Sequence, residues 1–202
     1  MVIPEPLYSA FIRQTKSLSV ALGYRDLPTR LHSERVRDLS TVIGERYGLS
    51  EEELDILKIG ASFHDIGKIG MPDHLLLKPS QFDEDDWEVM RLHAEVGEKI
   101  LLSTELKGSK QAALVIRHHH EYYDGKGYPE GLSADEIPIC SRIISIADSY
   151  DAMAESRPYH RAKPHAEIMD ILRNETGHKH DPAIMSVFCG IIDNSEFRAA
   201  DN

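Results

Sequence analysis

Residues 50–68 read SEEELDILKIGASFHDIGK, and this run decides how the middle of the chain folds. Ser50 and Glu53 have the capping-box spacing, in which each side chain binds the backbone N–H of the other at the start of a helix. The following positions recur at helical spacing on one face: Leu54, Leu57, Ala61 and His64. The stretch therefore predicts a buried helix that closes near Gly67 and carries a His–Asp pair at its end.

Apolar residues recur at helical spacing over most of the remaining chain. In no segment do apolar and polar residues alternate strongly enough to predict a half-buried sheet. The pair Asp181-Pro182 is typical of a helix N-cap followed by proline at the first helical position. We therefore expect an all-α fold, a single compact domain of about seven to eight helices. These helices are expected near residues 5–23, 30–47, 50–67, 83–102, 109–120, 140–155, 164–174 and 182–193.

The chain has 202 residues, of which 41% are hydrophobic and 28% are charged, as is typical of one globular domain. We expect an N-terminal helix over residues 1–24, the main domain over residues 25–195 and a C-terminal tail over residues 196–202. The N-terminal helix could be a native terminus or the stub of a connector. No run approaches the ~18–20 apolar residues that a membrane span requires. Prolines and an acidic residue at positions 4–6 interrupt any signal-peptide layout.

The formal net charge is −11, from 23 Lys and Arg against 34 Asp and Glu. This balance argues against binding to duplex DNA or RNA, which favours a basic face, but a local cationic site can still hold a small anion. Because Cys140 and Cys189 cannot build a disulfide scaffold, a reducing cytoplasm is favoured. We therefore expect a cytoplasmic protein with no nucleic-acid partner and no membrane partner.

Histidine is the unusual component: the chain has 11, and metal binding is the first explanation to test. His64 and Asp65 point about 100° apart on a helix, so both can approach one ion. Taken alone, the pair is equally explained by the helix dipole. His93, beside an apolar stripe, could likewise be an ordinary core histidine. Asp148 follows an apolar run and should point inward, where a lone carboxylate needs a partner.

The whole set of helix-borne imidazoles and carboxylates is better explained by two divalent ions than by separate structural roles. Such ligands suit Fe, Mn, Zn, Ni or Co, and no thiolate selects zinc. A single Asp that bridges two ions is the usual centre of a two-metal hydrolytic site, and Asp65 is the natural candidate. Lys68, one turn after His64, could neutralise phosphate oxygens. The pattern therefore indicates metal-dependent phosphoryl chemistry.

Taken in order, these residues resemble the HD-GYP domain, a subset of the HD metal-dependent phosphohydrolases. The resemblance extends from about residue 25 to about residue 188. It rests on Arg25-Asp26, His32-Ser33-Glu34-Arg35-Val36, His64-Asp65-Ile66-Gly67-Lys68, Lys78-Pro79, His93, His119-His120-Glu121, Gly127-Tyr128-Pro129, Ile146-Ala147-Asp148, Asp151-Ala152, Arg157-Pro158-Tyr159 and Asp181-Pro182.

The resemblance implies a helical HD-type domain and a bacterial phosphodiesterase that hydrolyses cyclic di-GMP to pGpG and often on to GMP. It implies that Lys68 contacts phosphate, that Tyr128 in the GYP loop borders the substrate, and that Arg157 contacts the dinucleotide. In some members the GYP loop also contacts regulatory partners, here a GGDEF-domain protein. His118 lies outside the match, as a surface residue or a neighbour of the ligands. The implied metal ligands are His32, His64, Asp65, His93, His119, His120 and Asp148.

One position departs from the family pattern. Members with three ions carry a Glu four residues before the first His, where this chain has Pro28, which has no ligating side chain. We therefore expect two divalent ions, with iron or manganese favoured, and no third ion. Some two-metal members stop at pGpG, so the end product stays open.

Three other functions need to be separated from this one. The same chemistry could act on cyclic GMP-AMP or on a nucleoside monophosphate, although the GYP segment argues against a plain nucleotidase. A degenerate domain could bind cyclic di-GMP or a GGDEF partner without cleavage, but all seven ligand positions are filled. A structural helical adaptor would leave the histidines without a role. The sequence also leaves open whether the chain forms a homodimer.

Overall fold

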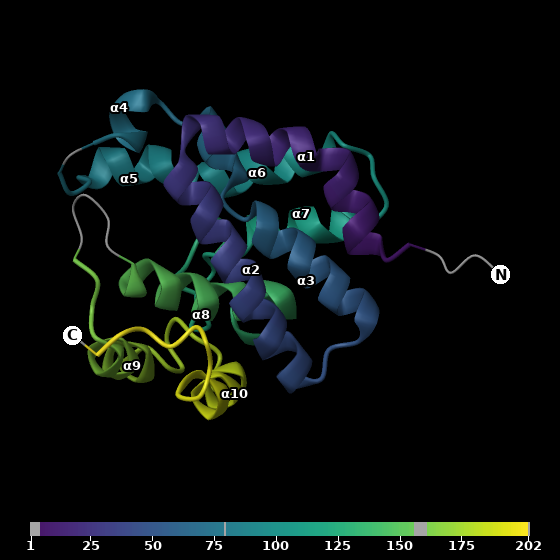
Figure 1. The fold of residues 1–202 in the computed structure, drawn as a ribbon. Coiled ribbons are helices and arrows are strands. Elements are labelled where there is room, and N and C mark those ends of the chain that lie inside the picture. The colour runs from purple at the N-terminus through teal and green to yellow at the C-terminus, as the bar shows by residue number, and fades with distance from the viewer. Residues whose placement is uncertain (1–4, 79, 156–160, 202) are drawn as a thin grey trace.

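The computed structural model describes residues 5–78, 80–155 and 161–201, which pack as a bundle of helices at several angles (Figure 1). Within these ranges there is no β-strand, and only two isolated backbone bridges occur. The elements are α1 Leu7–Arg25, α2 Leu27–Tyr47, α3 Glu51–Phe63, η1 Ile66–Gly70, α4 Asp73–Leu76, α5 Glu84–Arg91, α6 His93–Leu102, α7 Ser109–Arg117, η2 Ala134–Glu136, α8 Ile139–Ala154, α9 His165–Asn174 and α10 Pro182–Ile192.

The prediction of an all-α fold is confirmed, and every expected helix is present. The helix expected over residues 83–102 divides at Leu92 into α5 and α6, so that His93 begins α6. The one-turn helix α4 and the 3-10 helix η1 occupy a stretch in which no separate helix was expected. The capping box at Ser50 and the N-cap at Asp181 form as predicted, because both depend on side chains next to the backbone they bind.

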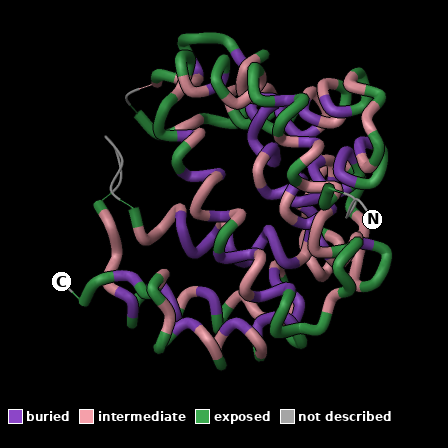
Figure 2. The backbone as a smooth tube through the Cα atoms, turned by 45° about the vertical axis from the view of Figure 1, so that its right-hand side comes forward, coloured by how far each residue is buried: buried purple, intermediate pink, exposed green. Residues whose placement is uncertain are grey.

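Helix α2 runs through the centre of the bundle and packs against α1, α3, α8 and α10 (Figure 1). Its buried side joins α3, α8, α9 and α10 in one core, around residues such as Leu57, Ile143 and Phe188. A second core lies between α1, α3, α6 and α7, around Phe11 and Phe63. Buried segments line the inward sides of the helices (Figure 2). Helix α3 contributes residues to both cores, so His64 and Asp65, which follow it, lie where the two cores meet.

The junction of α1 and α2 is held by the first motif of the family resemblance. Asp26 caps α2 and accepts hydrogen bonds from the backbone N–H and the hydroxyl of Thr29, at 3.1 and 2.6 Å. The guanidinium of Arg25 donates to the carbonyl oxygen of Met71 and to Asp73, at 2.5 and 2.7 Å. These contacts tie the start of α2 to the segment after η1. The division of the chain at residue 24 stays a prediction, and α1 packs against both α2 and α3.

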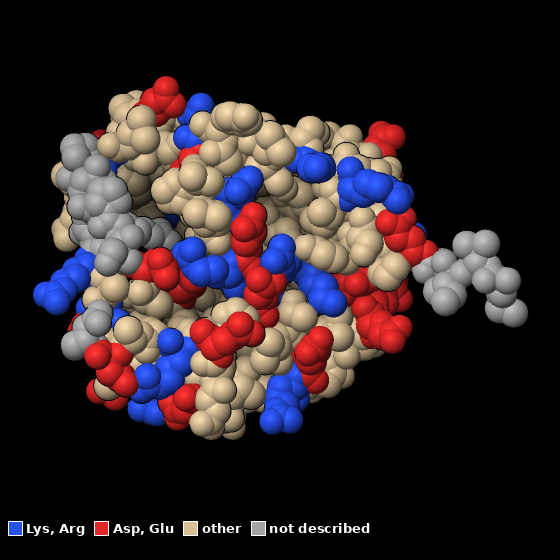
Figure 3. Space-filling view, in the orientation of Figure 1, with Lys and Arg blue, Asp and Glu red and all other residues tan. Residues whose placement is uncertain are grey.

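Two properties of the exterior bear on partners. No helix in the described ranges combines the length and the apolar character that crossing a membrane would require. On the face drawn in Figure 3, acidic and basic side chains are interspersed, and no continuous basic patch covers that face.

Candidate metal centre

The structure brings all seven predicted metal ligands together from five segments of the chain. His32 comes from α2, and His64 and Asp65 directly follow α3. His93 begins α6, His119 and His120 follow α7, and Asp148 lies on α8. Ligand atoms fall into two groups, each with all atoms within 4.8 Å of one another: His93, His119 and His120, and His32, His64 and Asp148.

Asp65 lies between these two groups and faces both. Its Oδ1 atom is 3.5 Å from Nε2 of His93, and its Oδ2 atom is 3.5 Å from Nε2 of His64. The residue is only 2% exposed. A carboxylate with one oxygen toward each group is the arrangement that a bridging ligand of two ions requires. The bridging role expected for Asp65 stays a prediction.

Three of the imidazoles are oriented by the backbone of their own segments. The Nδ1–H groups of His64, His93 and His119 donate to the carbonyl oxygens three residues earlier, at 2.8, 2.7 and 2.6 Å. With the proton on Nδ1, each Nε2 atom carries a lone pair. Such a hydrogen bond on the far ring nitrogen is typical of a metal-binding histidine, because it sets the tautomer and the orientation.

None of these three Nε2 lone pairs accepts a hydrogen bond from an N–H or O–H group of the described residues. Nε2 of His64 is buried and has no hydrogen-bond partner among the described residues. The Nε2 atoms of His93 and His119 lie 3.5 Å apart, and two acceptors at this distance repel unless a proton or a cation lies near both. Buried acceptors without donors cost free energy, which a divalent cation would recover. The donor set therefore fits two cations of the kind that bind imidazole and carboxylate.

The charges around the centre favour cation binding as well. Burial lowers the pKa values of His64, His93 and His120, and that of His119 to about 3, so these rings are neutral near pH 7. Burial alone would raise the pKa of Asp65, but the adjacent charge of Lys68 and the neighbouring imidazoles hold it well below its usual range. Neutral imidazoles around an ionised carboxylate are the protonation states that a metal requires.

His32 differs from the other imidazoles because it contacts two carboxylates. Its Nε2 atom is 2.9 Å from Asp148, and its Nδ1 atom is 2.6 Å from Asp151. Burial lowers its pKa, but the hydrogen bonds to Asp148 and Asp151 outweigh this effect and raise the pKa to about 9. Asp151 also accepts two hydrogen bonds from Arg35, at 2.7 and 2.9 Å.

Asp151 belongs to a motif of the family resemblance, but the sequence predicted no role for it at the site. It orients His32 from α8, one turn after Asp148. Its signal in the sequence was the spacing: Asp151 is three residues after Asp148 on one helix, and Arg35 is three residues after His32 on another.

The predicted substrate-binding residues lie at the edge of the centre where the structure describes them. The ammonium of Lys68 is 2.6 Å from Oδ2 of Asp65. The ring of Tyr128 stacks on His120, with centroids 4.9 Å apart, and Arg91 lies 5.4 Å from the centroid of the same ring. Arg157 falls outside the described residues.

Two glycines permit the close approach of these segments. A Cβ atom on Gly67 would lie 1.9 Å from the carbonyl oxygen of His93, which means that η1 and α6 are in direct backbone contact. A Cβ atom on Gly127 would lie 2.2 Å from the backbone nitrogen of Tyr122. Both glycines belong to the motifs of the family resemblance, and both exclude a larger residue for steric reasons.

His118 belongs to neither of the two groups and lies instead with Glu121 and Glu130. It is 6% exposed, and its Nε2 atom is 2.8 Å from Glu130, which also accepts a hydrogen bond from Arg117. Glu121 accepts a hydrogen bond from the backbone N–H of Glu130 at 2.8 Å. His118 therefore joins the end of α7 to the GYP loop, and of the two roles left open for it, a position at the surface is wrong.

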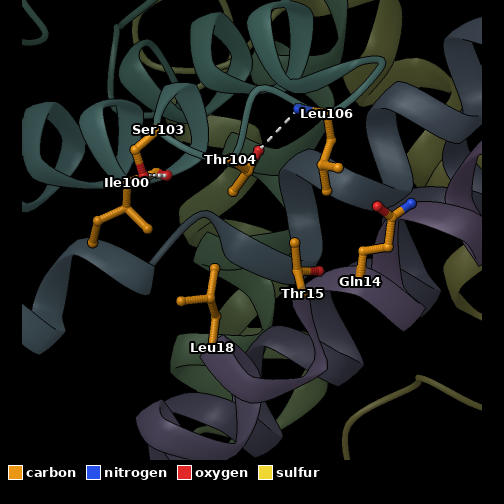
Figure 4. Close-up of a pocket in the computed structure, with 7 residues that line it drawn as sticks. All are labelled: Gln14, Thr15, Leu18, Ile100, Ser103, Thr104 and Leu106. Atoms are coloured by element: carbon orange, nitrogen blue, oxygen red, sulfur yellow. Dashed lines mark hydrogen bonds between the residues drawn. The ribbon is translucent and has the colours of Figure 1, made fainter.

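A cavity of about 300 Å³ lies elsewhere, between α1 and the segment that ends α6 (Figure 4). The residues that line it carry no imidazole, carboxylate or thiol, so this cavity offers no ligand of the kind found at the centre and no group for acid–base chemistry. They are Gln14, Thr15, Leu18, Ile100, Ser103, Thr104 and Leu106.

Comparison with known proteins agrees with this geometry. The sequence model of the HD domain family matches residues 12–184. The cyclic di-GMP phosphodiesterase response regulator RpfG of Xanthomonas campestris pv. campestris is 39% identical over 171 residues, which are 84% of this chain and 45% of that protein. The 3'3'-cGAMP-specific phosphodiesterase 2 of Vibrio cholerae is 34% identical over 171 residues, 85% of this chain and 33% of that protein. The chain thus spans less than half the length of these relatives.

A solved structure has the same fold. The HDG"Y"P protein Bd1817 from Bdellovibrio bacteriovorus superimposes with a TM-score of 0.67 at 21% identity, over 82% of this chain and 52% of that one. The comparisons therefore confirm the resemblance drawn from the motifs, and the chain belongs to the HD domain family.

Proposed function

We propose that this chain is a metal-dependent phosphodiesterase that hydrolyses cyclic di-GMP to pGpG, with pGpG or GMP as the end product. The observation that carries the proposal is the position of Asp65, whose two oxygens face two separate histidine groups. The relative named for cyclic di-GMP hydrolysis supports the substrate. Cyclic GMP-AMP is the alternative substrate, which the relative from Vibrio cholerae supports.

The cofactors in this proposal are two divalent ions, iron or manganese. His93, His119 and His120 would hold one, His32, His64 and Asp148 the other, and Asp65 would be shared. When bound, such a pair supplies Lewis-acid activation for an in-line displacement at phosphorus. Pro28 precedes His32 by one helical turn and offers no ligating atom, so we propose no third ion.

The chain's own residues complete the site. Lys68 would neutralise a non-bridging phosphate oxygen, since its ammonium already lies beside Asp65 at the centre. Asp151 would hold His32 in one orientation. Tyr128 would border the substrate, and Arg157 would contact the dinucleotide, both on the strength of the family resemblance.

The protein partners and the cellular location of this chain are also proposals. A GGDEF-domain protein at the GYP loop and a homodimer rest on the resemblance alone. A cytoplasmic location is supported by Cys140 and Cys189, which are both free thiols.

The test combines metal analysis with product chromatography on protein purified without oxygen. We expect two ions per chain and cleavage of cyclic di-GMP under iron or manganese. Cyclic GMP-AMP measured side by side decides the substrate: a higher kcat/KM for it would favour the alternative. Metal-loaded protein that binds cyclic di-GMP but never cleaves it would contradict the proposed activity and leave a binding module.

A further inference from the structure

One arginine beside the centre has no carboxylate partner. Arg91, the last residue of α5, is exposed, and its guanidinium contacts only the ring of Tyr128 among the described residues. Its hydrogen-bond donors therefore face no carboxylate among the described residues, although it stands against a side chain that contacts the centre.

Several other cationic side chains that the structure describes near the centre are paired with carboxylates. Lys68 binds Asp65 at 2.6 Å, and Arg35 binds Asp151 at 2.7 Å. Further out, Arg117 binds Glu98 at 2.6 Å, and Lys78 contacts Asp86. Unlike these four side chains, Arg91 keeps its hydrogen-bond donors available to an anionic ligand.

The position of Arg91 tells which part of a ligand it can reach. Arg91 contacts Tyr128, and Tyr128 stacks on His120, so one aromatic ring separates the guanidinium from the metal-ligating group. A phosphate bound at Asp65 and Lys68 would lie at the buried centre, whereas Arg91 is exposed and contacts Tyr128 rather than the centre itself. A cyclic dinucleotide carries two phosphodiesters, and only one of them can occupy the centre at a time.

We propose that Arg91 binds the second phosphodiester of a cyclic dinucleotide, the one that is not being cleaved, and so selects a substrate with two phosphodiesters over a simple one. This inference rests on the proposed function. A guanidinium suits the role because its planar donors match phosphate oxygens in pairs. Tyr128 would support the side chain of Arg91 from one face.

The test compares two substrates in the metal-loaded protein: cyclic di-GMP, and bis(p-nitrophenyl) phosphate, which has a single phosphodiester. We expect Arg91→Ala to raise KM for cyclic di-GMP about ten- to hundredfold, the loss typical of one charge-assisted contact, with little change in kcat. Hydrolysis of bis(p-nitrophenyl) phosphate should not change. Arg13→Ala, which removes the same charge from the first half of α1, is the matched control and should alter neither substrate.

Ionic strength separates a phosphate contact from a contact with a guanine base. Salt screens an exposed ion pair, so KM of the wild type for cyclic di-GMP should rise with salt more steeply than KM of Arg91→Ala. Arg91→Lys keeps the charge, so it should keep the steep salt dependence and show an intermediate KM. A raised KM with an unchanged salt dependence would mean contact with a neutral group and would overturn the inference.

Two other results would also overturn it. If Arg91→Ala lowers kcat for both substrates equally, Arg91 acts through Tyr128 and the metal-ligating residues instead. If KM for cyclic di-GMP does not change, Arg91 does not touch the substrate. A wild-type protein that cleaves bis(p-nitrophenyl) phosphate but no cyclic dinucleotide would overturn the proposed function itself, and this inference with it.

Discussion

Nδ1 of His32 lies 2.6 Å from a carboxylate oxygen of Asp151, although 119 residues separate the two in the sequence. Because Asp151 holds the proton on Nδ1, Nε2 is the ring nitrogen that can bind a cation. Arg35 holds the same carboxylate through two hydrogen bonds. The orientation of one predicted metal ligand is thus set by a residue outside the seven predicted ligands.

Asp151→Asn should weaken metal binding at the group of His32, His64 and Asp148 by about 10–100-fold, the usual effect of removing the partner of a ligating histidine. Titration of the metal-free protein with manganese would measure it. Arg35→Gln is the control, because it removes the ion pair but leaves the carboxylate on His32. If both variants lost the same amount of metal affinity, the ion pair of Asp151 with Arg35, and not its bond to His32, would control metal binding.

Asp65→Asn should remove ions from both groups at once, because each group faces one oxygen of this carboxylate. Phosphodiesterase activity should fall to background, and metal analysis should show fewer than one ion per chain. Asp170→Asn, on the exposed side of α9, makes the same chemical change and should retain both ions and full activity. Full activity in Asp65→Asn would refute the assignment of the centre.

Metal-free protein should lose stability as the pH rises from 6.5 to 9. The folded pKa of His32, about 9, lies above its ordinary value of 6.5, so its contribution is complete below pH 6.5 and vanishes above pH 9. The difference corresponds to about 3 kcal/mol of unfolding free energy. Urea unfolding in a chelator, with His32→Gln as the reference, would measure it. The gap between the two proteins should shrink across this range, and a constant gap would contradict the prediction.

Below pH 6.5 the stability of the metal-free protein changes for a different reason, because the pKa of His119 is lowered rather than raised. Burial holds the pKa of His119 at about 3, below its ordinary 6.5, so the neutral ring stabilises the fold above pH 6.5. That contribution is lost as the pH falls. Since His32→Gln retains His119, both proteins should share this loss, which leaves the comparison above pH 6.5 unaffected.

Gly67→Ala should destabilise the protein by several kcal/mol, roughly the cost of overpacking a contact that cannot relax, because the added Cβ would meet the backbone of His93. Thermal unfolding and metal content should both decrease. Gly190→Ala on α10 is the control, since its Cβ would meet nothing within 4 Å. This second change should stabilise the helix by up to about 1 kcal/mol. Similar unfolding of the two variants would show that the contact of η1 with α6 tolerates a methyl group.

The helices could be predicted from the sequence because their determinants are local. The capping box at Ser50 and the proline after Asp181 act within one turn, and the apolar spacing of α3 describes one face of one helix. The break at Leu92 was missed because the apolar spacing continues across it. At this point the side chain of His93 binds the carbonyl of Met90, an interaction that the spacing does not reveal.

The sequence by itself determined the all-α class and singled out the seven candidate ligands, since residue type and order along the chain carry that information. Only the tertiary structure decided how the ligands divide into two groups, that Asp65 stands between them, and that Asp151 orients His32. The reason is physical: a metal site is defined by distances of a few ångströms between side chains from separate helices. Those distances follow from how α2, α3, α6, α7 and α8 pack, which no local pattern specifies.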